Sequence, residues 1–155
     1  LARSMNDLGL MALRFNFRGV GESVGSYGHG EGEIKDLIAV ADYVRLRWPE
    51  AAIWLAGFSF GAVVAARAAV SIKPERLITI APAVNVLGKE LRSIPTMPWL
   101  VIQGDADEVV PAAEVSNWVE RLEIQPDLII MPGVGHFFHG HLVDLRALLV
   151  KQLHF

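Results

Sequence analysis

The stretch that decides the fold is WLAGFSFGAVVAARAA, from Trp54 to Ala69. A short apolar run stops at Gly57, Ser59 follows two residues later, and Gly61 stands two residues beyond the serine. The Ala- and Val-rich residues that follow predict a helix directly after a strand. The chain must therefore reverse sharply at Ser59. We expect glycine on both sides because a side chain there would clash where the helix and the strand cross.

The rest of the chain alternates between short apolar runs and helical patterns. The runs predict strands at Leu10–Phe17, Ala52–Gly57, Arg76–Ala81, Trp99–Gly104 and Asp127–Met131. Helices are predicted at Glu33–Trp48, Phe60–Ser71, Ala112–Leu122 and His139–Leu153, with the end of another at Leu1–Leu8 and a short one near Leu87–Leu91. Unalternating strands separated by helices are typical of an α/β fold, a mostly parallel sheet with helices on both faces. Residues 1–155 contain no linker, which predicts a single domain without a separate cap domain.

Composition excludes several classes of function. Lys and Arg total 14 against 17 for Asp and Glu, which argues against binding to nucleic acid or to an anionic membrane. There is no cysteine, and the five histidines lack the H-E-x-x-H spacing, so we expect no metal and no other cofactor. No targeting segment is visible and no apolar run reaches the roughly 18 residues of a membrane helix. We therefore expect a cytoplasmic protein with a small-molecule partner.

Gly57–Gly61, which reads GFSFG, matches the nucleophile elbow G-x-S-x-G in its strand–turn–helix context. At such a turn the helix N-terminus directs N–H groups at the place where an oxyanion forms, and the Phe60 N–H is the natural donor. The alternative is that Ser59 only caps the helix between two turn glycines.

An acid and a histidine follow later strands, in the chain order that this elbow needs. GDADEVVP offers Asp105, Asp107 and Glu108, and PGVGHFFHG offers His136 and His139. Both loops lie at the carboxyl end of the sheet, where ligands bind. With the serine in place, we favour Asp107 over Asp105 and His136 over His139. Either aspartate could instead cap its turn, and His136 could be an unpaired loop histidine.

Together these residues resemble the α/β-hydrolase superfamily, and the resemblance spans essentially the whole chain. GFSFG is similar to its elbow, GVGHFF to its histidine loop, and FNFRGVGES to the loop after its fourth strand. GDADEVVP is similar to its acid loop, in which the family's spacing places the acid at Asp107. The nearest resemblance is to small bacterial hydrolases with little or no cap domain, related to esterases and dienelactone-hydrolase-like proteins.

The resemblance implies a serine hydrolase that cleaves an ester, a thioester or a related acyl bond. Ser59 would attack, His136 would move the proton, Asp107 would hold the imidazolium and the Phe60 N–H would bind the oxyanion.

The loop RGVGESVG is no phosphate loop, because its third glycine comes one residue late and no Walker lysine follows. We interpret Arg18, Gly19 and Val20 as a border of the substrate site, with a structural role for Arg18.

One departure from the family concerns the start of the chain. The superfamily has three further strands before the helix that ends near Leu8, and the third lies between the Leu10–Phe17 and Ala52–Gly57 strands. The loop after it normally supplies a second oxyanion N–H. We therefore expect the chain to be N-terminally incomplete, and to be slow and weakly stable alone. With the upstream strands restored it should hydrolyse short-chain aryl esters. The alternative is a non-catalytic binding scaffold or an inactive fragment.

Overall fold

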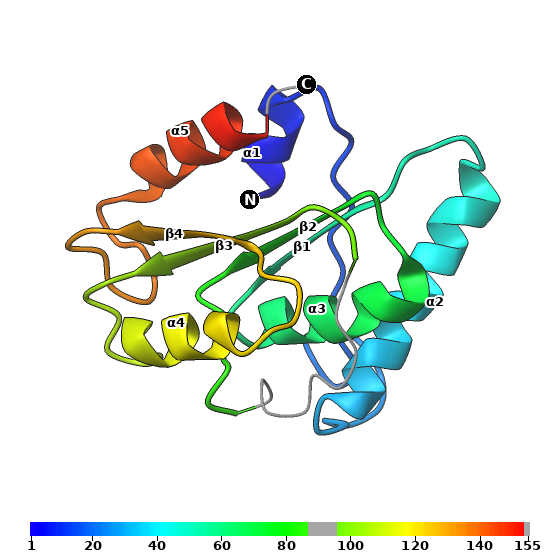
Figure 1. The fold of residues 1–155 in the computed structure, drawn as a ribbon. Helices are drawn as coiled ribbons and strands as arrows, with labels where there is room; N and C mark the ends of the chain where they lie inside the picture. The colour runs from blue at the N-terminus through cyan, green and yellow to red at the C-terminus, as the bar shows by residue number, and fades with distance from the viewer. Residues whose placement is uncertain (87–95, 154–155) are drawn as a thin grey trace.

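A computed structural model describes residues 1–86 and 96–153 of the chain. Four parallel strands form one sheet in the order β1-β2-β3-β4, as Figure 1 shows. They are β1 (Trp54–Phe58), β2 (Arg76–Ile80), β3 (Trp99–Gly104) and β4 (Asp127–Met131). The predicted α/β class with a parallel sheet is confirmed. The short helix predicted near Leu87–Leu91 lies outside the described residues.

Helices cover both faces of this sheet. Helices α1 (Ala2–Asp7) and α5 (Leu142–Gln152) lie on one face, as seen in Figure 1. On the other face lie α2 (Glu31–Arg47), α3 (Phe60–Ile72) and α4 (Ala112–Glu120). The last helix starts three residues later than the predicted His139, because Phe138 and Gly140 have positive φ angles, which no α-helix accommodates.

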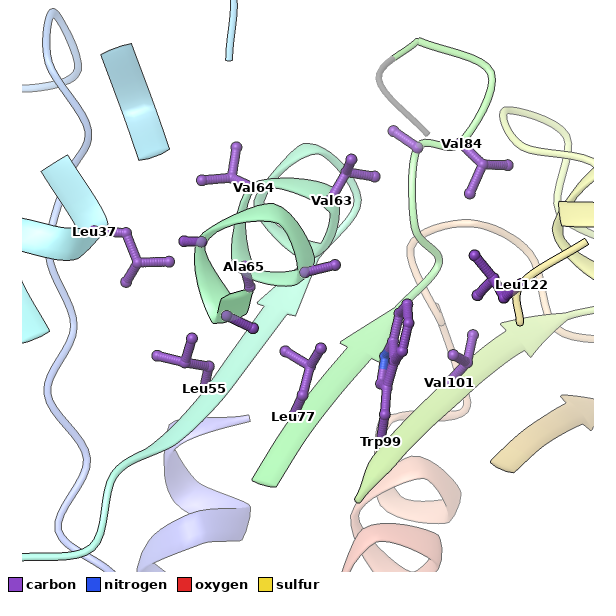
Figure 2. Close-up of a cluster of buried hydrophobic side chains, with 14 of the residues drawn as sticks. Leu37, Leu55, Val63, Val64, Ala65, Leu77, Val84, Trp99, Val101 and Leu122 are labelled. Atoms are coloured by element: carbon purple, nitrogen blue, oxygen red, sulfur yellow. The ribbon is translucent and has the colours of Figure 1, made fainter. Parts of the chain in front are cut away.

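The strands are apolar on both faces because each face carries its own hydrophobic core. Leu77 of β2 and Val101 of β3 pack on the α3 side, beside Val63 and other buried residues (Figure 2). The intervening Ile78 belongs to the core on the α1 and α5 side. Alternate residues of a strand point to opposite faces, so covering both faces removes the apolar–polar alternation. Each fully buried Leu or Ile stabilises the fold by about 1.5–3 kcal/mol.

Leu10–Phe17 was predicted to be a strand, and this prediction is wrong. The segment runs beside β1 without pairing to the sheet (Figure 1). Among the described strands β1 pairs only with β2, so it forms an edge of the sheet. A cavity of about 420 Å³ lies between β1 and the segment, lined by Leu13, Phe15 and Phe58 among others. A strand exists through its ladder of hydrogen bonds, and within residues 1–86 and 96–153 no such ladder joins this segment to a strand.

The crossing of β1 and α3 requires one of the two elbow glycines. A Cβ on Gly57 would lie 2.7 Å from the Ala62 Cα and nearer still to the Gly61 carbonyl, so no side chain fits there. A Cβ on Gly61 would meet nothing within 4 Å, so the predicted clash is wrong at this position. The difference is one of direction, because α3 turns its backbone toward Gly57, whereas Gly61 borders the cavity beside β1.

The two glycines should therefore respond differently to alanine. We expect Gly57→Ala to lower the free energy of unfolding by about 3 kcal/mol or more, because strand and helix must move apart. Gly61→Ala should leave it unchanged or raise it by up to about 1 kcal/mol, because alanine favours the helix. Urea unfolding of both variants measures the difference, and equal losses would contradict the crossing described here.

Candidate active site

Ser59 stands at the apex of the turn between β1 and α3 in an unusual backbone conformation. Its φ is 52° and its ψ is −116°, a region that costs a non-glycine residue about 1–3 kcal/mol. Backbone hydrogen bonds hold it there. The Ser59 N–H donates to the Ile80 carbonyl at 2.9 Å, and its carbonyl accepts from Ala62 and Ala83. The Ser59 side chain makes no capping hydrogen bond to α3, so the interpretation as a helix cap does not hold.

His136 connects this serine to an aspartate. The His136 Nε2 lies 3.0 Å from the Ser59 Oγ, and the His136 Nδ1 lies 2.8 Å from the Asp107 Oδ2. The imidazole is buried, with 3% of the residue exposed. One ring nitrogen thus faces a hydroxyl and the other a carboxylate. Such an arrangement can take a proton from the hydroxyl while the carboxylate stabilises the imidazolium.

Two loops must press together to make this contact. β3 and β4 are neighbours that end level with each other, with Gly104 paired to Met131. A Cβ on Gly104 would lie 2.8 Å from the Val134 carbonyl carbon and nearer still to its oxygen. The Ala106 N–H donates to that same oxygen at 3.1 Å. Only glycine therefore lets the acid loop lie directly on the histidine loop.

Asp107 is an almost buried carboxylate with a full set of donors. Its Oδ1 accepts from the Val109 N–H at 2.9 Å and the Val110 N–H at 2.7 Å. Its Oδ2 accepts from the Gln103 Nε2 at 2.9 Å and faces His136. Burial raises the pKa of Asp107, but the hydrogen bonds together outweigh burial, so the pKa lies below its usual value. Asp107 therefore stays ionised beside the imidazole.

The alternative acid and histidine lie elsewhere. The Asp105 Oδ1 accepts a hydrogen bond from the Gly133 N–H at 2.6 Å, so this carboxylate ties the two loops together at the surface. The His139 ring stacks on Phe137 with 5.7 Å between centroids. Of the residues predicted for the site, the structure thus brings together Ser59, Asp107 and His136.

Arg18, in the predicted border of the substrate site, forms an ion pair with Asp36 that holds the loop to α2. The Arg18 Nη2 lies 2.7 Å from the Asp36 Oδ1, and the backbone N–H of Arg18 donates to the Asp36 Oδ2 at 3.0 Å. This pairing holds the pKa of Asp36 below its usual value. Gly19 closes a turn with Val24, and Val20 is exposed. A border role for Arg18, Gly19 and Val20 therefore remains a prediction.

Other residues near the site were missed or misjudged. Phe17 and Tyr27, which flank the glycine-rich loop, place their rings 5.9 Å and 5.8 Å from the Phe60 ring. The Glu108 carboxylate was one of the candidate acids. It instead accepts a hydrogen bond from the backbone N–H of His136 at 3.3 Å. Gln103 was missed, although a lone amide inside the buried strand WLVIQG was a signal.

The described residues show neither a cluster of metal ligands nor a membrane-spanning helix. Within residues 1–86 and 96–153, no group of three or more His, Cys, Asp or Glu side chains is placed to hold a metal ion. In the same residues no helix has the length and apolarity needed to cross a membrane.

Comparison with protein families and curated proteins gives consistent matches. The model of the serine aminopeptidase S33 family matches residues 1–96. An uncharacterized protein of Rickettsia prowazekii is 38% identical over 85% of this chain, and one of Mycobacterium tuberculosis is 30% identical over 96% of it. The chain spans 60% of the length of each of these two relatives.

Solved structures match nearly all of the chain. A Coxiella burnetii α/β serine hydrolase homologue is 46% identical with a TM-score of 0.93, over 98% of this chain and 73% of its own. A Xanthomonas campestris α/β serine hydrolase without lid is 51% identical with a TM-score of 0.92, over 97% of this chain and 68% of its own. The serine aminopeptidase S33 model covers more than half of the residues of this chain, and both structures are α/β serine hydrolases. The chain therefore belongs to the α/β serine hydrolase family.

Proposed function

We propose that this chain carries the catalytic site of a serine hydrolase that cleaves an ester, a thioester or a related acyl bond. The observation that carries the proposal is the continuous contact from the Ser59 Oγ through the His136 imidazole to the Asp107 carboxylate. Because the chain spans 60% of the length of its curated relatives, the activity is proposed for the full-length protein.

In this mechanism the reaction passes through an acyl-enzyme. The Ser59 Oγ attacks the carbonyl carbon while the His136 Nε2 takes the hydroxyl proton. The bond from the carbonyl carbon to the leaving group then breaks, and His136 passes the proton to that group. Water attacks the acyl-serine with the same help from His136 and releases the acid. Asp107 keeps the imidazole oriented and stabilises its charged form throughout.

The oxyanion formed by each attack needs a donor that is already in place. We assign this role to the Phe60 N–H, because Phe60 is the first residue of α3 and its N–H has no acceptor within the helix. The positive end of the α3 dipole adds to the same stabilisation. Ser59 and this donor are thus neighbours on one rigid turn.

The substrate we propose is a small-molecule acyl compound. We further propose that residues 1–155 form one domain without a separate cap domain. The Xanthomonas campestris relative, 51% identical, is a serine hydrolase without lid, which supports this reading. A site without a cap would admit a substrate directly from solvent.

Loss of Ser59 or His136 should abolish turnover. In the full-length protein we expect Ser59→Ala and His136→Ala each to lower the turnover of an aryl acetate by at least about 10³-fold, because nucleophile and base act as one unit. His139→Ala is the matched control, since this ring contacts Phe137, and it should keep turnover within roughly threefold. A His139→Ala loss as large as that of His136→Ala would contradict the assignment.

The two aspartates provide a second matched pair. Asp107→Asn should lower turnover by about 10³–10⁴-fold while the protein stays folded, because the imidazolium loses its charged partner. Asp105→Asn keeps an oxygen for the Gly133 N–H, so we expect a loss of less than about tenfold. Turnover and circular dichroism of both variants test this. A larger loss at Asp105 would mean that the acid is wrongly assigned.

A further inference from the structure

Gln103 is a fully buried polar residue near the end of β3, directly under the acid loop. Its side-chain Nε2 lies within hydrogen-bond distance of three oxygens. They are the Asp107 Oδ2 at 2.9 Å, the Val110 carbonyl at 3.0 Å and the Gly104 carbonyl at 3.2 Å. The amide nitrogen therefore lies at the centre of the loop that carries Asp107.

The amide can take only one orientation. All three neighbours of the Nε2 are acceptors, so exchanging the nitrogen and the oxygen would place a carbonyl against a carboxylate and two carbonyls. In the observed orientation the Gln103 Oε1 is buried and accepts no hydrogen bond from any described residue. A buried carbonyl without a donor is destabilising, so the fold alone does not explain why a glutamine stands here.

The contact with Asp107 supplies an explanation. The Oδ1 of Asp107 is held by backbone N–H groups of its own loop. Among the described residues, the Oδ2 is held by Gln103 and His136 alone. Gln103 comes from a strand, so it ties the oxygen that faces His136 to the sheet. We propose that Gln103 is a positioning residue, whose amide clamps the Asp107 carboxylate against His136. This inference rests on the function proposed above.

The clamp also favours the charged form of Asp107. Burial raises the pKa of this carboxyl, and the Gln103 hydrogen bond is one of those that outweigh burial. Of the titratable groups, His136 faces Asp107 directly. The Glu108 carboxylate does not face Asp107 but accepts a hydrogen bond from the backbone N–H of His136. Without the amide, burial is opposed by fewer donors, so the Asp107–His136 pair should take up a proton at a higher pH.

The pH profile of an active-site reaction therefore tests the proposal. In Gln103→Met a side chain of similar shape lacks the donor. We expect the acid limb of the rate of fluorophosphonate labelling of the full-length protein to move up by about one pH unit. Labelling on that limb should then be about tenfold slower, while the alkaline plateau stays within roughly threefold of the wild type. Urea unfolding should show a folded variant of lower stability, because the buried Asp107 Oδ2 and Val110 carbonyl lose their donor.

A matched control separates positioning from packing. Thr79 of β2 is equally buried, and its hydroxyl accepts a hydrogen bond from the Trp99 Nε1 at 2.9 Å, without contact to Asp107. Thr79→Val should lower stability without moving the acid limb. Gln103→Leu removes the same donor with a different shape, and it should move the limb in the same direction as Gln103→Met. An unmoved limb in folded Gln103 variants, or a shift in only one of them, would overturn the proposal.

Failure of the proposed function would give a different result. If the wild type is not labelled, or Ser59→Ala is labelled equally well, the serine hydrolase assignment itself fails. The Gln103 contact is then judged by NMR titration of the Asp107 carboxyl, which needs no turnover. A higher titration midpoint in both Gln103 variants than in the wild type and in Thr79→Val supports the clamp, and an equal midpoint overturns it.

Discussion

The close crossing of β1 and α3 at Gly57 is the constraint on which the rest of the site depends. A Cβ at this position would meet the backbone of α3. Because glycine has no Cβ, the helix can start directly above the strand end. That approach forces Ser59 to a positive φ, and three backbone hydrogen bonds hold it there. The serine hydroxyl and the first N–H of α3 consequently share one rigid turn. A looser crossing would separate the proposed nucleophile from the proposed oxyanion donor.

A second close approach places the partners of the serine. Gly104 lets the Val134 carbonyl lie against the end of β3, so the acid loop and the histidine loop are stacked at the same edge of the sheet. Asp107 then sits among four donors that offset the cost of burying its charge. The geometry of the site is therefore a property of strand ends and loop contacts.

Much of this arrangement could be predicted from local patterns. β3 and β4 have the predicted bounds, because short apolar runs between turn residues are strong signals. The contacts of His136 with Ser59 and with Asp107 follow from parallel strands, whose carboxyl ends meet at one edge. Leu10–Phe17 also has an apolar pattern, but a strand needs a partner, and the described residues supply none for this segment. Whether a glycine such as Gly61 is required depends on the direction of a Cβ, which spacing alone does not reveal.

The mechanism proposed here requires Ser59 to be an activated nucleophile. Its most direct test is to treat the full-length protein with a fluorophosphonate and to locate the adduct by tandem mass spectrometry. We expect one adduct per chain, on the Ser59 hydroxyl in the peptide that contains GFSFG. An adduct on another serine, or no adduct on a folded protein, would contradict it.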